Sequence, residues 1–207
     1  MAAEPARAGR ASADRSASMQ WRLLDAAIAV LDEKGYSGTT TLEVQSRAGV
    51  SRGALLHHFG SRTELMLAAV NHLAQRRLEA ILRLVRTQAP DTGRIEWAVR
   101  VLWSQHDGPL FRASVALWLA ARTDPGLLAA LLPQERVVGH SIRAVAAELF
   151  GPEVAEADGY GDALDIVIDA MRGAAAREVL RAPGSDDRLI RLWSALISDR
   201  VGLASQL

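Results

Sequence analysis

Apolar residues recur at three- and four-residue spacing along most of the chain from Met19 onward. Leu24, Ala27, Ile28 and Leu31, for example, share one face of a helix with a period of 3.6 residues. No segment alternates apolar and polar residues with β-branched enrichment over the length of a strand, so an all-α fold is predicted. Breaks at glycine, proline and capping residues predict helices over 19–35, 40–49, 51–58, 61–88, 92–106, 109–123, 125–150, 159–181 and 185–201.

The predicted helices form two groups, three short helices followed by a larger bundle. We expect residues 19–66 to form the first domain and residues 67–207 the second. Residues 1–18 are rich in alanine, serine and charge with almost no large apolar side chain, which predicts a flexible arm. Pro133 lies inside the helix predicted over 125–150, and we expect it to kink or restart that helix.

The composition narrows the class of protein. The 207 residues are 49% hydrophobic but only 5% aromatic, so the core is expected to consist mainly of small aliphatic side chains. The chain has no cysteine, which excludes disulfides and Cys-based zinc sites and favours a cytoplasmic location. Neither a membrane span nor a secretory signal is expected from the apolar runs. The 24 basic and 24 acidic residues cancel, so any binding to nucleic acid depends on where the charges lie.

The stretch AGVSRGALLHHF, residues 48–59, has the pattern of a helix, a tight turn and a second helix. Gly49 permits the positive φ that such a turn needs, and Ser51 is placed to cap the helix that follows. Thr40 and Ser61 each stand three residues before a glutamate, which is the pattern of a capping box. We therefore predict a helix-turn-helix whose second helix is short enough to enter a DNA major groove.

Spacing within this second helix predicts which side chains face inward. Val50, Leu55 and Phe59 are expected in the core of the three short helices. The residues left on the outward face are Arg52, Gly53, Leu56 and His57.

Two adjacent histidines, His57 and His58, raise the question of a metal site. Neighbouring helical residues point about 100° apart, whereas a metal-binding pair on a helix needs i,i+4 spacing. No acidic or cysteine ligand lies close to them in sequence. We therefore predict no metal or other cofactor, and a DNA-facing role for both histidines.

Residues 23–70 resemble the DNA-binding domain of the TetR family of bacterial transcriptional regulators. The landmarks are EKGY after the first helix, TT before the second, AGVSRGALLHHF itself and SRTEL at the start of the fourth. The resemblance implies an all-α homodimer whose N-terminal domains bind a palindromic operator and whose C-terminal domains hold an effector pocket. By position it implies that Ala54 and His57 face base edges, that His58 and Arg62 approach phosphates, and that Thr40 caps its helix close to the DNA.

The chain departs from the family pattern at Leu56. The family usually has a tyrosine there, whose hydroxyl reaches a phosphate, so this contact is lost or replaced, for example by an apolar contact to a thymine methyl group. Arg52 could bind DNA or only solvate the start of its helix, and we include it among the DNA contacts. The expected DNA-binding residues are Thr40, Ser51, Arg52, Ala54, Leu56, His57, His58 and Arg62.

Large aromatic side chains in the second domain stand among small aliphatic ones. Helices lined by alanine and tryptophan can enclose a mostly apolar cavity with a few polar groups. The segment ALWLAARTDPGLLAAL, residues 116–131, is also similar to one often seen in the C-terminal domains of the TetR family. The alternative is that the tryptophans are ordinary core residues and that the polar residues lie on the surface. The expected ligand-binding residues are Trp103, His106, Phe111, Trp118, Arg122 and His140.

The last two predicted helices each carry an apolar stripe, and the first of them has small residues from Gly173 to Ala176. Two such helices from each of two chains would form a four-helix bundle across a two-fold axis. Burial against the chain's own helices is the alternative. The expected dimer-interface residues are Leu164, Ile168, Met171, Ala175, Leu189, Trp193 and Leu196.

Together these patterns predict a TetR-like transcriptional regulator. We expect a repressor that binds a palindromic operator as a homodimer and is released by a small-molecule effector. A helical ligand-binding protein, or a DNA-binding regulator without a small-molecule effector, is the alternative. An enzyme is not expected, because the sequence has no P-loop, no dinucleotide-binding glycine motif, no metal constellation and no G-x-S-x-G nucleophile elbow.

Overall fold

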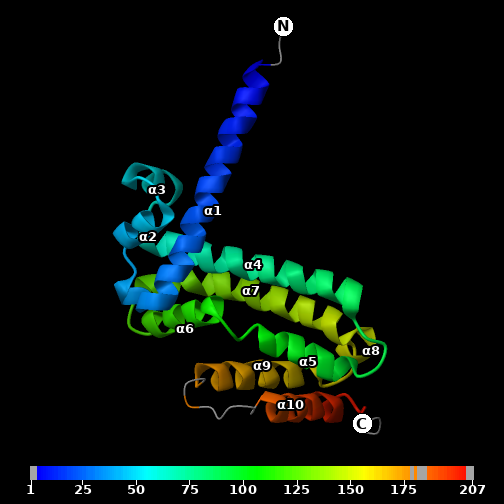
Figure 1. Cartoon of the computed structure of the whole chain (residues 1–207). Coiled ribbons are helices and arrows are strands. Elements are labelled where there is room, and N and C mark those ends of the chain that lie inside the picture. Colours follow the sequence, from blue (N-terminus) through cyan, green and yellow to red (C-terminus); the bar gives the residue numbers. More distant parts are fainter. Residues whose placement is uncertain (1–3, 178–179, 181–185, 204–207) are drawn as a thin grey trace. The chain divides into compact units, whose positions relative to one another are not determined.

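The computed structural model describes residues 4–177, 180 and 186–203. Within these ranges every regular element is a helix, so the all-α prediction is confirmed (Figure 1). The elements are α1 (Glu4–Gly38), α2 (Thr41–Ala48), α3 (Arg52–His58), α4 (Arg62–Gln88), α5 (Arg94–Ser104), α6 (Pro109–Ala121), α7 (Pro125–Phe150), α8 (Pro152–Ala155), α9 (Tyr160–Ala176) and α10 (Asp186–Arg200).

The chain forms two compact units. The first contains residues 1–73 and 112–134, and the second contains residues 74–111 and 135–207. The division falls inside α4, α6 and α7, so each of these helices contributes to both units. The units therefore do not coincide with the domain boundary predicted between residues 66 and 67, since the sequence pattern shows where helices end but not which helices pack together.

The N-terminal segment differs from the flexible arm predicted for residues 1–18, because α1 is helical from Glu4 onward. Ten of these eighteen residues are alanine or arginine, which have the highest helix propensities. The segment also extends an existing helix, so it does not bear the cost of nucleating a new one. At the other end of α1, Gly35 has φ 65° and ψ 178°, which interrupts the helix where the sequence predicts its end.

The core of the first unit supports the three short helices. Leu23 and Leu31 of α1, Val44 of α2 and Leu65 of α4 are almost completely buried. Leu55 of α3 packs into the same unit with 1% of its surface exposed. Burying each such side chain contributes about 1.5–3 kcal/mol. This core holds α2 and α3 in place although each has only two turns.

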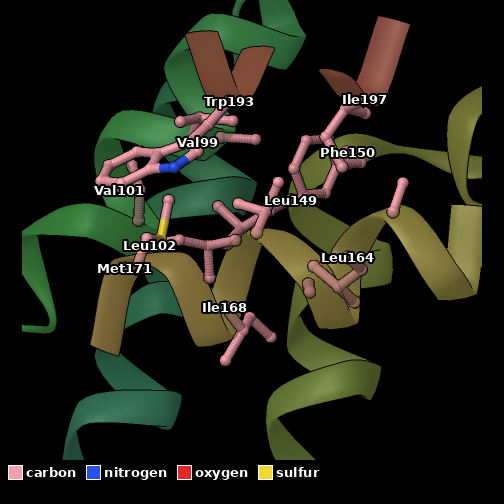
Figure 2. Packing of buried hydrophobic residues seen from close by; sticks show 14 of the residues in the cluster. Val99, Val101, Leu102, Leu149, Phe150, Leu164, Ile168, Met171, Trp193 and Ile197 are labelled. Carbon is pink, nitrogen blue, oxygen red and sulfur yellow. The ribbon is translucent and has the colours of Figure 1, made fainter. Parts of the chain in front are cut away.

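The second unit has its own hydrophobic core, built from α4, α5, α7, α8, α9 and α10 (Figure 2). Leu149, Met171 and Ile197 have no exposed surface. The α10 helix packs against α5 and α9. Arg94 of α5 donates to the carbonyl oxygens of Leu149 (2.8 Å) and Glu148 (2.7 Å), which satisfies free carbonyls in the last turn of α7.

The restart predicted at Pro133 does not occur, since α7 continues as one helix from Pro125 to Phe150. Pro133 cannot donate to the carbonyl of Ala129, four residues earlier. Both residues are exposed, so water can satisfy that carbonyl. In the described part of the chain, no helix has the length and apolar character needed to cross a membrane.

Candidate functional site

The α2 helix begins and ends as the sequence predicts. The Thr40 hydroxyl caps its start and accepts a hydrogen bond from the Glu43 amide at 3.2 Å. Gly49 ends it in the left-handed conformation, with φ 63° and ψ 41°. The Val50 amide then donates to the Gln45 carbonyl at 3.1 Å, which is the Schellman pattern. The turn between α2 and α3 is therefore set by local hydrogen bonds.

The α3 helix presents the outward face that its spacing predicts. Ser51 caps it by accepting from the Ala54 amide at 3.2 Å. Leu55 and Phe59 face inward and are 1% and 3% exposed. Ala54, His58 and Val50 are partly buried. The exposed residues of this segment include Arg52, Gly53, Leu56 and His57.

Two ion pairs join α1 to α2. Arg47 donates from both terminal nitrogens to the Glu33 carboxylate, at 2.5 and 2.7 Å, and this interaction lowers the pKa of Glu33. Lys34 pairs with the Glu43 carboxylate at 2.8 Å, so this carboxylate is not used for a reciprocal capping box with Thr40. Arg52, by contrast, forms no hydrogen bond or ion pair with the described residues.

Two hydrogen bonds cap the start of α4, just after the end of α3. The Ser61 hydroxyl accepts from the Glu64 amide at 3.1 Å, and the Gly60 amide donates to the Glu64 carboxylate at 2.9 Å. The predicted capping role of Ser61 is thus confirmed, with the carboxylate reaching the amide one residue earlier than in the standard capping box. These bonds hold the start of α4 next to the end of α3.

Arg62, expected to approach a phosphate, contacts Tyr36 at the end of α1. Its guanidinium carbon lies 4.1 Å from the centroid of the Tyr36 ring, and one terminal nitrogen donates to the Tyr36 carbonyl at 2.5 Å. The Tyr36 hydroxyl in turn lies 3.2 Å from the Thr63 hydroxyl. Arg62 therefore fastens α4 to the turn after α1, a role that the sequence pattern does not reveal. Its phosphate contact stays a prediction.

Replacing Arg62 by alanine is expected to lower the free energy of unfolding by about 1–2 kcal/mol, because a cation–π contact and a charged hydrogen bond are lost. Arg62→Lys keeps the charge but loses the planar guanidinium group that stacks on the Tyr36 ring. It should therefore lose most of the same stability. Urea unfolding measures both variants. If Arg62 also meets a phosphate, only the alanine variant should reduce the salt slope of DNA binding, by about one unit. Unchanged unfolding midpoints in both variants would contradict the structural role.

The two adjacent histidines lie at the end of α3. The His57 and His58 rings lie 5.5 Å apart in an edge-to-face arrangement, with His57 exposed and His58 partly buried. No group of three or more His, Asp or Glu residues that could hold a metal ion is found among the described residues.

Three of the six expected ligand-binding residues lie together in the second unit. Trp103 stacks on His106 with ring centroids 6.1 Å apart, and His106 meets the edge of Phe111 at 5.4 Å. Trp193, expected at the dimer interface, joins this group with its ring centroid 5.1 Å from that of Trp103. We call these four residues the aromatic cluster. The other three expected residues are Trp118 and Arg122, which belong to the first unit, and His140, which is exposed on α7.

His106 is the titratable residue of the aromatic cluster. Burial lowers its pKa to about 4, although its Nδ1 lies 3.0 Å from the Leu102 carbonyl, and the nearby positive charge of Arg172 lowers the pKa further. The imidazole is therefore neutral at neutral pH. Arg77 lies partly buried in the same unit and donates to the Gln105 carbonyl at 3.1 Å.

The expected dimer-interface residues are in the core of the chain itself. Leu164, Ile168, Met171, Ala175 and Trp193 are at most 7% exposed, and Figure 2 shows four of them, Leu164, Ile168, Met171 and Trp193, in this core. Leu189 and Leu196 are partly buried and pack against the same core. Five of the seven predicted interface residues are therefore used in the chain's own core, and the dimer interface itself stays a prediction. The outer faces instead carry Ile166 of α9, 49% exposed, and Leu192 of α10, 54% exposed.

Known proteins are similar to this chain both in sequence and in fold. Residues 23–69 match the family model described as bacterial regulatory proteins, tetR family. The HTH-type transcriptional regulator CymR of Pseudomonas putida is 31% identical over 173 residues, covering 82% of this chain and 84% of CymR. The HTH-type transcriptional repressor AcnR of Corynebacterium efficiens is 26% identical, covering 78% of this chain and 97% of AcnR.

Solved structures of other proteins have a fold similar to that of this chain. The multidrug binding protein EbrR, crystallised with ethidium, has a similar fold with a TM-score of 0.60 at 22% identity, covering 86% of this chain and 97% of EbrR. The family model covers the segment whose caps, turn and buried positions are described above, and the similarity to CymR extends through most of the second unit. The chain therefore belongs to the TetR family of bacterial transcriptional regulators, with α2 and α3 as its DNA-binding helix-turn-helix.

Proposed function

We propose that this regulator is a homodimeric repressor that binds a palindromic operator through α3 and is released by a small molecule. The observation that carries the proposal is the outward face of α3, which is exposed, capped at its start and held on a well-packed core. The similarity to AcnR, a repressor by name, supports repression, and the ethidium complex of EbrR supports a small-molecule effector.

The outer faces of α9 and α10 are our proposed dimer surface, in place of the buried stripes. On α9, Ile166, Ala170 and Gly173 are exposed at helical spacing. On α10, Leu192 is exposed and lies next to other outward residues of that helix. Small residues on α9 allow a second helix to approach closely, and two helices from each chain would form a four-helix bundle.

The aromatic cluster is our proposed effector site, for an apolar or amphipathic molecule. Trp103 and His106 are only partly buried and present ring faces and a neutral imidazole. The α4 helix begins four residues after α3 ends, and its C-terminal half belongs to the second unit. A ligand that binds one orientation of α4 more tightly would change the spacing of the two α3 helices, which must match about 34–36 Å along the duplex.

Selection of bound duplexes from a random pool by the full-length chain tests this function. We expect an inverted repeat whose half-site centres lie about one helical turn, or a multiple of it, apart. Sedimentation of the complex should give an even number of chains per duplex. Recovery of single, unrepeated sites bound by one chain would contradict the dimeric repressor, and recovery of no preferred sequence would contradict operator recognition altogether.

A further inference from the structure

The outward face of α3 contains a glycine that the fold itself does not need. Gly53 has an ordinary helical φ, and a Cβ built on it would meet only the Ser51 hydroxyl oxygen, at 3.9 Å. Glycine inside a helix is less favourable than alanine by about 0.8–1 kcal/mol. Neither the backbone conformation nor the internal packing requires glycine at this position. The absence of a side chain here instead lets another molecule approach the backbone of α3 closely.

Arg52 is the residue before Gly53 on α3. Arg47 is held by Glu33, and Arg62 is held by Tyr36. Arg52 is exposed and forms no hydrogen bond or ion pair with the described residues. A free guanidinium on a helix in the major groove makes its most specific contact to the O6 and N7 atoms of guanine, as a pair of parallel hydrogen bonds.

Leu56 stands one helical turn after Arg52 on the same face. It is 50% exposed, although it follows the almost fully buried Leu55. Residues at i and i+4 lie about 6 Å apart along a helix, which corresponds to between one and two base-pair steps of about 3.4 Å. An isobutyl group has no polar contact to offer, and the one apolar group on the major-groove edge of a base is the C5-methyl group of thymine.

We propose that Arg52 and Leu56 read a two-base element in each half-site, a guanine held by Arg52 and a thymine methyl packed on Leu56. The two bases lie within two base pairs of each other, and Gly53 lets the helix approach them closely. This inference rests on the proposed function, since it assigns base preferences to an operator-binding helix.

Single-atom changes in the selected operator test the proposal with the full-length protein. Each thymine of a half-site is replaced by deoxyuridine, which removes only the methyl group, and each guanine by 7-deazaguanine, which removes only the N7 acceptor. We expect one thymine position to weaken binding about fourfold per half-site, the effect of one buried methyl group. We expect one guanine position, within two base pairs of it, to weaken binding about tenfold.

Protein variants assign each base to its residue. Leu56→Ala should bind the thymine and uracil operators equally, whereas Leu42→Ala, a change at the 67% exposed leucine of α2, should keep the discrimination. Arg52→Ala should lose sensitivity to 7-deazaguanine alone. Gly53→Ala should weaken operator binding at least about tenfold while its melting temperature stays equal or rises, because the added methyl group fits the folded chain.

Different results would contradict this inference and the proposed operator-binding function. If the protein binds its selected operator but no thymine responds to loss of its methyl group, the reading of Leu56 is overturned and operator binding stands. Sensitive bases more than two base pairs apart, or discrimination that survives Leu56→Ala, overturn it in the same way. If no operator is selected at all, the proposed function fails first.

Discussion

Replacing Ile166 by glutamate is expected to dissociate the dimer and to weaken operator binding by about 10²–10⁴-fold, because the second half-site then loses the benefit of linked binding. Ile166 is 49% exposed on the outer face of α9, next to the exposed Asp165 and Asp169. Across a two-fold axis each added carboxylate would face apolar or like-charged groups of the partner. Leu192→Glu on α10 should act in the same way. Sedimentation velocity and titration of the operator measure the two effects.

Two control variants make this prediction specific. Leu128→Glu adds the same charge at a leucine of the first unit that is 41% exposed, and it should remain dimeric. Ile168→Glu places the charge at a residue only 7% exposed in the core, so it should unfold the second unit instead of giving folded monomers. A folded, dimeric Ile166→Glu variant with normal operator affinity would show that the outer face of α9 is not the interface.

The second unit is expected to lose about 3 kcal/mol of stability as the pH falls from 6.5 to 4, through His106 alone. Burial lowers the pKa of this imidazole from 6.5 to about 4 in the folded chain. The unfolded chain therefore takes up a proton below pH 6.5 that the folded chain does not accept. The stability is complete above pH 6.5 and is lost progressively until the pH reaches the folded-state value.

His106→Phe provides the matched comparison, since it keeps an aromatic ring between Trp103 and Phe111 but has no group to titrate. It loses the contact of Nδ1 with the Leu102 carbonyl, so it should be less stable than the natural chain at pH 7.5. Carboxylates titrate equally in both proteins. Urea unfolding from pH 7.5 to 4.5 should therefore show the stability of the natural chain falling towards that of the variant. Parallel pH profiles would show that His106 is not held neutral by burial.

The helix-turn-helix could be predicted closely from the sequence because its determinants are local. The Thr40 and Ser51 caps act on amides three residues away, and Gly49 adopts its conformation through bonds within the same turn. The inward positions of Leu55 and Phe59 follow from helical periodicity, which depends only on spacing. Such features are visible in a short stretch of sequence, and the structure has them where the pattern places them.

The dimer and effector residues could not be predicted in the same way. Periodicity identifies the apolar stripe of α9 correctly, but a stripe looks the same whether it packs on its own chain or on a second one. Leu164, Ile168 and Met171 pack in the chain's own core, which leaves the less apolar face with Ile166 outside. Trp193 likewise joins Trp103, a residue 90 positions earlier, in the aromatic cluster.

The sequence by itself determined most of the helices, the turn between α2 and α3, and the family to which the chain belongs, because caps, spacing and glycine conformation act over a few residues. Only the tertiary structure decided that Arg62 is held by Tyr36, 26 residues away, that Arg47 is held by Glu33, and that Arg52 pairs with none of the residues that the structure describes. Partners of this kind are chosen by which helix faces the packed core brings together, and no local pattern records that choice.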